Sequence, residues 1–344
     1  MIFTNARIIF PDTIREDLAV TVHAGKIVEI GAPVAGADDA VDLHGNFLAP
    51  GFVDLHVHGG NGHDAMEAKA EALRAICDYH ASGGTTSLLL TTATAPFPAI
   101  LLALTQIGKL RGQIPEIAGA HVEGPFISRD RAGAQNLEFI CEANAELIGC
   151  LLEHRDVIKR VTIAPEIKGA MTAMKDLSEA GIVVSGGHSN AWEEEARAAL
   201  ENGMRSVTHT FNCMSSARRR GTKRIAGLLE VALSEPKVCC ELNGSVFQLG
   251  GRNCVAKNGV CFLAGEPVLA GSTSRLIDLV RTMMREAAVP LLDVIAMASL
   301  NPAREAGLAD KGEIAVGKDA DLVVLSPELG VLQTYVAGAR TFAR

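Results

Sequence analysis

The chain has 344 residues, a length that suits a barrel-sized domain with a small second unit rather than one small core. Hydrophobic residues make up 48% and aromatic residues only 4%, so we expect a core of aliphatic side chains. The net charge of −8 argues against nucleic acid or an anionic membrane as the main partner, and no apolar run approaches the roughly 20 residues of a membrane span. The eight cysteines form no CxxC pair, which favours reduced thiols and a cytoplasmic location.

Both ends of the chain are composed of short strand-like segments. Residues 2–49 include "LAVTVHAGKIVEIG", in which apolar residues alternate with polar ones around Gly turn signals, and the last 30 residues have the same character. We therefore predict that 1–49 and 313–344 together build a small β-sandwich domain. Residues 50–312 are left to form the catalytic domain.

The middle of the chain alternates buried-strand runs with helical stretches such as 70–83 and 171–181, which is typical of βα units around a parallel sheet. Seven strands are predicted, at 51–59, 85–92, 117–124, 161–166, 181–189, 205–212 and 237–243. The pattern favours an α/β fold of the TIM-like (β/α)8 barrel type, but a closed barrel of that type needs eight strands. One strand is unaccounted for.

Histidine and glutamate side chains follow several of these strands at their C-terminal ends. His56 and His58 lie two residues apart, so in a strand both imidazoles face one side. In a TIM barrel these ends surround the active site, where residues remote in sequence converge. Histidine and carboxylate ligands suit a catalytic divalent metal ion with one position left open for water. The predicted ligands are His56, His58, Glu123, His188 and His209.

His121 is two residues before Glu123 and is predicted to support the site rather than to bind metal. The other five histidines are predicted to be structural or at the surface. They are His23, His44, His63, His80 and His154.

A set of motifs, in order and almost end to end, resembles the N-acetylglucosamine-6-phosphate deacetylase family of the amidohydrolase superfamily. The motifs are "PGFVDLHVHG", "HVEGPF", "GGHSNA", "THTFNCM", "LAGST", "ASLNPAR" and "GKDADLVVL". The resemblance implies that Glu123, His188 and His209 hold the principal metal ion. His56 and His58 match a pair that some members use for a second ion, so one or two ions are expected, with zinc first and iron, manganese or cobalt as alternatives.

The same resemblance implies hydrolysis of the acetamide of N-acetylglucosamine 6-phosphate. Asn212 and Cys213 stand at positions that help to hold the sugar phosphate, and the following run "ARRRGTKR" carries five cations in eight residues. Arginine forks match phosphate oxygens, so Arg218, Arg219 and Arg220 are predicted phosphate ligands, although the run also fits a solvated loop. The family commonly forms homodimers in which the neighbouring subunit helps to bind phosphate.

The chain departs from the family where its eighth strand should be. The family's catalytic Asp, in an [ST]-D-A motif, has no counterpart here, nor does the D-G-x-H motif after the seventh strand. A strand–helix unit of roughly 30 residues is missing between Asn243 and Gly244. Either the printed sequence omits a segment of a longer chain, or the deletion is genuine. Two unpaired barrel edges favour the first alternative, which predicts a spatial break between Asn243 and Gly244.

A second departure concerns substrate specificity. Many family members have a substrate-contacting His where this chain has Gln135, which can form hydrogen bonds but carries no charge. N-acetylgalactosamine 6-phosphate, or another N-acyl compound, therefore stands as an alternative substrate. A third alternative is a catalytically silent sugar-phosphate-binding protein, if the segment with the Asp is truly absent.

Overall fold

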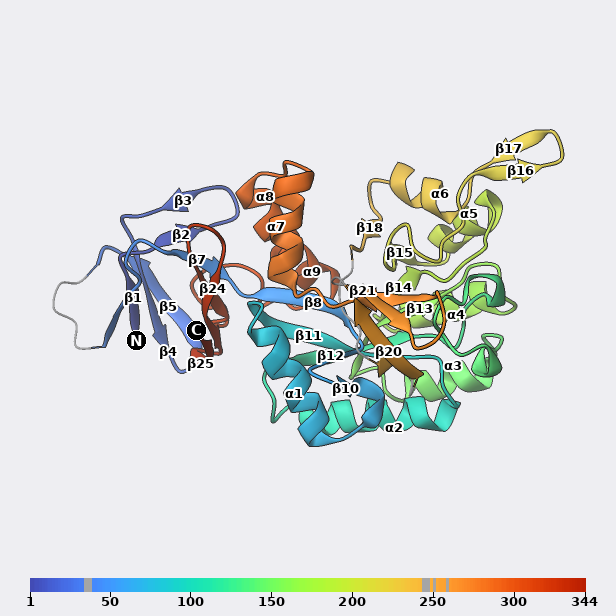
Figure 1. Cartoon of the computed structure of the whole chain (residues 1–344), viewed down its shortest axis with the longest axis horizontal. Coiled ribbons are helices and arrows are strands. Elements are labelled where there is room, and N and C mark those ends of the chain that lie inside the picture. Colours follow the sequence, from blue (N-terminus) through green and yellow to red (C-terminus); the bar gives the residue numbers. More distant parts are fainter. Residues whose placement is uncertain (34–38, 243–247, 250–251, 258–259) are drawn as a thin grey trace.

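The structure is a computed structural model, and it describes residues 1–33, 39–242, 248–249, 252–257 and 260–344. The predicted break between Asn243 and Gly244 lies outside these residues. The described part of the chain forms a curled parallel sheet with helices around it, next to a second unit built from strands (Figure 1).

The central element is a seven-stranded sheet in the order β18-β15-β14-β13-β12-β11-β8, in which every neighbouring pair is parallel. The seven predicted strands are all present, although the last is reduced to two residues. All eight residues of the longest strand of this sheet, "TTSLLLTT", are buried, as expected for a parallel strand covered on both faces. The strands are β8 (Phe52–Val57), β11 (Thr85–Thr92), β12 (Ile117–Glu123), β13 (Ile158–Ile163), β14 (Val183–Gly186), β15 (Met204–Val207) and β18 (Cys239–Cys240).

Helices connect successive strands and bury one apolar stripe each. In the first of them Leu73, Ile76 and Cys77 face the sheet with helical spacing, which explains why this segment folds as a helix. The connecting helices are α1 (Ala70–Ala81), α2 (Phe97–Leu110), α3 (Ala145–Leu152), α4 (Ala170–Glu179), α5 (Glu193–Glu201) and α6 (Leu228–Ser234). None of the helices in the described part of the chain combines the length and the apolar character that a membrane crossing requires.

The sheet is open within the described residues, because β8 and β18 are its two edges and pair with each other nowhere. Three helices from the end of the chain pack near β8, and Figure 1 shows them above that strand. They are α7 (Leu276–Glu286), α8 (Leu291–Ala298) and α9 (Leu300–Glu305). The carboxyl ends of all seven strands still point to one edge of the sheet, where the polar residues gather.

Strands from both ends of the chain share one six-stranded sheet, β25-β24-β23-β7-β2-β3, beside a four-stranded sheet, β5-β4-β1-β6. One hydrophobic cluster joins them, and within it the rings of Phe3 and Tyr335 meet edge to face at 4.9 Å. The strands are β1 (Ile2–Thr4), β2 (Arg7–Ile9), β3 (Ile14–Arg15), β4 (Ala19–His23), β5 (Lys26–Gly31), β6 (Ala40–Asp42), β7 (Phe47–Pro50), β23 (Leu322–Leu325), β24 (Val331–Val336) and β25 (Ala339–Ala343).

Several short strands and turns lie outside the parallel sheet and the two terminal sheets. The hairpin of β16 (Arg218–Arg220) and β17 (Lys223–Ile225) projects from the body of the molecule beside α5 and α6 (Figure 1). The remaining elements are β9 (Gly59–Gly60), β10 (His63–Asp64), β19 (Gln248–Leu249), β20 (Arg252–Lys257), β21 (Val260–Leu263), β22 (Leu269–Ser272) and the 3-10 turns η1 (Ala65–Glu67), η2 (Arg129–Arg131) and η3 (Leu137–Phe139).

Candidate metal centre

The structure brings together all five residues that the sequence predicts as metal ligands. His56 lies in β8 and His58 directly follows that strand, while Glu123 is the last residue of β12. His188 and His209 each stand two residues beyond the end of a strand, β14 and β15 respectively. Parallel strands end at one edge of the sheet, so their terminal side chains converge there.

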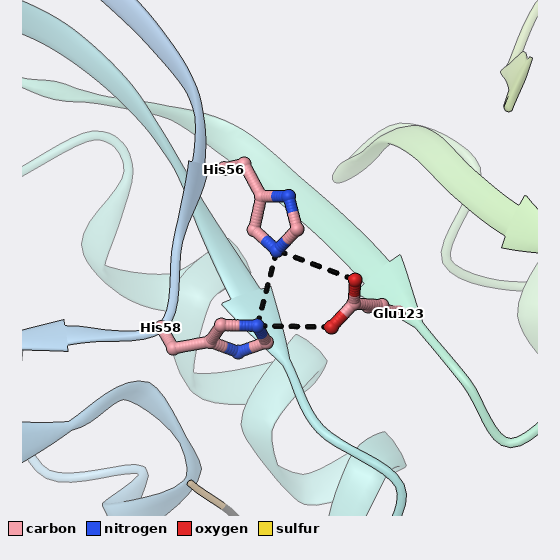
Figure 2. Close-up of side chains that lie close together, drawn as sticks. All are labelled: His56, His58 and Glu123. Atoms are coloured by element: carbon pink, nitrogen blue, oxygen red, sulfur yellow. Dashed lines mark hydrogen bonds and ion pairs between the residues drawn. The ribbon is translucent and has the colours of Figure 1, made fainter. Parts of the chain in front are cut away.

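The first group of three comprises His56, His58 and Glu123, which Figure 2 shows pointing toward one another. The Nε2 atoms of the two histidines are 3.0 Å apart. Nε2 of His58 lies 3.0 Å from Oε2 of Glu123, and Nε2 of His56 lies 3.5 Å from Oε1. All three side chains are buried.

The second group comprises Glu123, His188 and His209. The Nε2 atoms of these two histidines are again 3.0 Å apart, and they lie 3.4 Å and 3.1 Å from Oε1 of Glu123. Glu123 therefore belongs to both groups and lies between the two histidine pairs. This geometry offers room for one ion or for two ions that share a carboxylate.

The donor set fits a divalent cation. Two pairs of ring nitrogens face each other at 3.0 Å, an arrangement that neutral imidazoles tolerate only if a proton or a cation lies between them. Burial would lower the pKa of His56, but Glu241 and Glu123 raise it to about 10, so the site stabilises positive charge. Imidazole and carboxylate together suit zinc, iron, manganese or cobalt.

Backbone strain accompanies the second group. His188 has φ of 45° and His209 has φ of 34°, both in the left-handed region that non-glycine residues seldom occupy. Such strain persists where the surrounding structure holds it, and it clusters at functional sites. The strained backbone turns both imidazoles toward Glu123.

The outer ring nitrogens of three of the four histidines have partners, and these partners differ. Nδ1 of His188 donates to the carbonyl of Arg131 at 2.8 Å, and Nδ1 of His209 to the carbonyl of Asn212 at 3.2 Å. Nδ1 of His56 donates instead to a carboxylate, Oε1 of Glu241, at 2.7 Å. The sequence reasoning missed Glu241, although it too follows a strand directly, in "VCCELN".

Gln135, predicted to contact substrate, is buried beside Glu123. Its amide nitrogen donates to Oε2 of Glu123 at 2.6 Å, and its amide oxygen accepts from the backbone N–H of Thr94 at 2.7 Å. The glutamine thus holds the shared carboxylate in place.

Asn212 and Cys213 lie at the mouth of the second group. The side chain of Asn212 is exposed, and the thiol of Cys213 packs against His188 and Gly133. A Cβ atom at position 133 would lie 2.6 Å from Sγ of Cys213, so glycine is required there. Both predicted substrate residues therefore adjoin the metal-ligand cluster.

The three predicted phosphate arginines lie on the projecting hairpin, outside the ligand cluster. Arg218 stacks on the Trp192 ring at 3.6 Å and donates to the carbonyls of Asn190 and Ala191, while Arg220 pairs with Glu194. Arg219 and Arg224 face each other across the hairpin and form no hydrogen bond or ion pair with the rest of the described chain.

His121 lies outside both groups of possible ligands, as the sequence reasoning expected. Its Nε2 is 2.7 Å from the Thr162 hydroxyl, and its ring meets the ring of His56 edge to face at 4.6 Å. His121 therefore packs against the His56 ring and supports it.

A parallel α/β sheet with buried histidine and carboxylate ligands at its carboxyl edge defines a class of metal-dependent hydrolase. The chain belongs to the amidohydrolase family, whose model matches residues 47–341, and is thus an enzyme that cleaves carbon–nitrogen bonds by hydrolysis. The resemblance seen in the sequence motifs is confirmed.

Relatives of known activity match nearly the whole chain. An N-acetylglucosamine-6-phosphate deacetylase of Lysinibacillus sphaericus is 32% identical over 94% of this chain and 93% of its own length. An N-acetylgalactosamine-6-phosphate deacetylase of Escherichia coli O157:H7 is 30% identical over 85% and 86%. The fold matches a mutant N-acetyl-D-glucosamine-6-phosphate deacetylase from Mycobacterium smegmatis, solved with N-acetyl-D-glucosamine-6-phosphate, with a TM-score of 0.90, 27% identity, and coverage of 100% and 99%.

The alignment to the Lysinibacillus relative runs over 363 positions, more than the 344 residues of this chain. The alignment therefore contains positions at which the relative has a residue and this chain has a gap.

Proposed function

We propose that the chain hydrolyses the acetamide of N-acetylglucosamine 6-phosphate to glucosamine 6-phosphate and acetate, a step of amino-sugar metabolism. The observation that carries this proposal is the pair of ligand groups that share Glu123 at the carboxyl edge of the sheet. Relatives with this activity match over most of the chain and support it.

Each part of the site has a role in this reaction. Glu123, His188 and His209 would hold the principal ion, with His56 and His58 holding a second. When bound, a divalent metal ion polarises the acetamide carbonyl and lowers the pKa of water. Gln135 fixes the shared carboxylate, and Asn212 and Cys213 border the space where the sugar would lie.

The hairpin supplies the charge that would recognise phosphate. Arg219 and Arg224 are directly opposite each other, and two like charges in that position repel unless an anion lies between them. A phosphate monoester relieves this repulsion through charge-assisted hydrogen bonds. Because the hairpin projects away from its own ligand cluster, we propose that it binds phosphate in a homodimer, with the site of a second copy.

The proposed reaction also needs a group that transfers protons. A carboxylate must take a proton from the attacking water and deliver it to the leaving amine. The two carboxylates that contact ligand imidazoles are engaged, Glu123 with the ligand histidines and Gln135, and Glu241 with His56 and Arg160. We therefore propose that this carboxylate comes from the eighth-strand segment, and that turnover is slow compared with the full-length relatives if that segment is genuinely deleted.

A turnover assay with purified, zinc-loaded protein tests the proposal. We expect acetate release from N-acetylglucosamine 6-phosphate, and at least 100-fold less release from the Glu123→Gln variant, which loses the shared charge. An intact mass of 36.2 kDa would support a genuine deletion, and a mass several kilodaltons larger would restore the missing strand. Substrate binding without acetate release would identify the silent binding protein instead.

The epimeric substrate is the second candidate. Gln135 in place of the expected histidine, and the E. coli O157:H7 relative, favour N-acetylgalactosamine 6-phosphate. The ratio of kcat/KM for the two sugar phosphates decides between them.

We also propose that residues 1–49 and 313–344 form a small β-sandwich domain and that 50–312 form the catalytic domain. Support comes from the sheet in which strands of both termini pair directly, Leu48 of β7 with Val324 of β23 among them. The hydrophobic cluster shared by the two terminal sheets supports the same division.

A further inference from the structure

A chain of three buried side chains crosses the open side of the parallel sheet. Glu241, directly after the edge strand β18, accepts a hydrogen bond from Nδ1 of His56, which lies in the other edge strand β8, at 2.7 Å. Its second oxygen is 2.5 Å from Nη1 of Arg160 in β13. The side chains of His56, Glu241 and Arg160 are 3%, 10% and 1% exposed.

Both neighbours of His56 in this chain are fixed in position. The backbone of Glu241 is held by two hydrogen bonds, since its N–H donates to Val207 and its carbonyl accepts from Thr210. Nη2 of Arg160 donates to the hydroxyls of Ser185 at 2.8 Å and Ser206 at 2.9 Å. The backbone of Glu241 and the guanidinium of Arg160 are both fixed, so the Glu241 carboxylate has little freedom to move with the imidazole. The carboxylate therefore determines the position of the His56 ring.

This contact also decides the tautomer of His56. For Nε2 of His56 to present a lone pair to a cation, the ring proton must be on Nδ1. Glu241 accepts a charge-assisted hydrogen bond from that N–H, whereas Nδ1 of His58 is buried with no hydrogen-bond partner among the described residues. A carboxylate partner raises the basicity of a metal-bound imidazole more than a backbone carbonyl does.

The contact matters more here because, among the residues that the structure describes, no strand joins β8 to β18. A cavity of about 160 Å³ lies between β8 and β18, and its wall includes Asp54, His56, Glu241 and Leu276. No backbone hydrogen bond within the described residues ties one edge strand to the other. The link from Glu241 to His56 is thus a side-chain tie across this opening.

We propose that Glu241, anchored by Arg160, is a positioning residue that fixes His56 as a metal ligand across the open side of the sheet. The inference rests on the metal site of the proposed function but not on its substrate. Glu241 touches neither substrate nor ion in this role and acts only through the imidazole.

Zinc titration of the metal-free protein against a chromophoric chelator tests the proposal. The Glu241→Gln variant should bind one zinc ion 10- to 100-fold more weakly than the wild type, as loss of a carboxylate behind a ligand histidine does elsewhere. Glu305→Gln is the matched control, because Glu305 also neighbours Arg160 and Ser206 but contacts no histidine. This control should keep wild-type zinc affinity.

A merely structural role predicts a different pattern. In that case Glu241→Gln lowers the unfolding midpoint of the metal-free protein but leaves zinc affinity unchanged, and this result would overturn the proposal. A double-mutant cycle sharpens the distinction, because Glu241→Gln should have no further effect on zinc binding in a His56→Asn background. If both effects add fully, Glu241 does not act through His56.

A measurement on the wild type guards against variants that fail to fold. Nitrogen NMR of the histidine rings in the zinc-loaded protein should show His56 protonated at Nδ1, and protonation at Nε2 would overturn the proposal. Because neither experiment uses substrate, failure of deacetylation would refute the proposed function alone.

Discussion

Glu123 receives contacts on both carboxylate oxygens, and Gln135 supplies one of the shortest, 2.6 Å to Oε2. The other end of the Gln135 amide accepts from the backbone of Thr94, which fixes its orientation. At the scale of single residues, the shared carboxylate is therefore held by a side chain that is itself fixed by the backbone. Such contacts orient the ligands and are expected to tune metal affinity.

Replacing Gln135 with leucine tests this role. The variant keeps the side-chain volume but removes both hydrogen bonds, so kcat and zinc affinity should fall about 10- to 100-fold while KM changes little. Gln113→Leu, in the exposed turn that follows α2, is the control and should behave as wild type. A rise in KM with unchanged kcat would instead mean that Gln135 contacts the sugar.

The buried imidazole of His80 is expected to make the stability of the fold depend on pH. It is fully buried in α1, and its Nε2 donates to the carbonyl of Gly59, just after the first ligand pair. Burial lowers its pKa to about 4 from 6.5. The unfolded chain binds more protons between these two values, so stability rises with pH across that window and is lost as pH falls from 6.5 to 4.

We expect this histidine to contribute on the order of 3 kcal/mol to the acid sensitivity of the metal-free protein. Urea unfolding at pH 7, 5.5 and 4 should give a shallower fall for His80→Gln, which keeps a donor but cannot titrate. Equal pH dependence in both proteins would show that His80 is not neutral when buried.

At the scale of elements, the hairpin of β16 and β17 divides its cations into two kinds. Arg220 is neutralised by Glu194, and Arg218 is held by Trp192 and two carbonyls. Arg219 and Arg224 remain available opposite each other. A dianionic phosphate is therefore expected to contact this second pair.

The Arg219→Ala and Arg224→Ala variants should each raise KM for the sugar phosphate roughly 10-fold, since one charged hydrogen bond is worth about 1.5–3 kcal/mol. Hydrolysis of the sugar without phosphate should be unchanged. Arg220→Ala is the control, with an effect below about twofold, because an exposed ion pair contributes little. A larger effect of Arg220→Ala would place the phosphate on the other face of the hairpin.

The elements also explain how far sequence reasoning reached. The alternation of short apolar runs with helical stretches predicted all seven parallel strands. A strand such as β11, "TTSLLLTT", is short, rich in Leu and Thr, and bounded by helices. Convergence of His56, Glu123 and His188 followed from parallel topology alone. The role of Glu241 and the position of Gln135 depend on contacts with side chains of other strands. The hydrophobic pattern of the sequence does not predict such contacts.

At the scale of the whole molecule, ligands from four strands meet at one point of a sheet that lacks closure within the described residues. In a closed barrel, backbone hydrogen bonds join the first and last strands. Here β8 pairs with β11 on one side; on the other side it has no strand partner among the described residues and reaches Glu241 through the side chain of His56. A bound ion is therefore expected to act as a cross-link among β8, β12, β14 and β15.

Metal removal should consequently destabilise the entire chain rather than the site alone. An ion present at 100 times its dissociation constant stabilises the folded state by about 2.7 kcal/mol, which corresponds to roughly 4 °C in the unfolding midpoint for a chain of this size. We expect a chelator to lower the midpoint by about that amount and added zinc to restore it. Glu123→Gln, which removes the carboxylate shared by both ligand groups, should start at the lower midpoint and show no response to chelator or zinc. A wild-type midpoint that chelator leaves unchanged would mean that side-chain contacts such as Glu241–His56 hold the open sheet together without an ion.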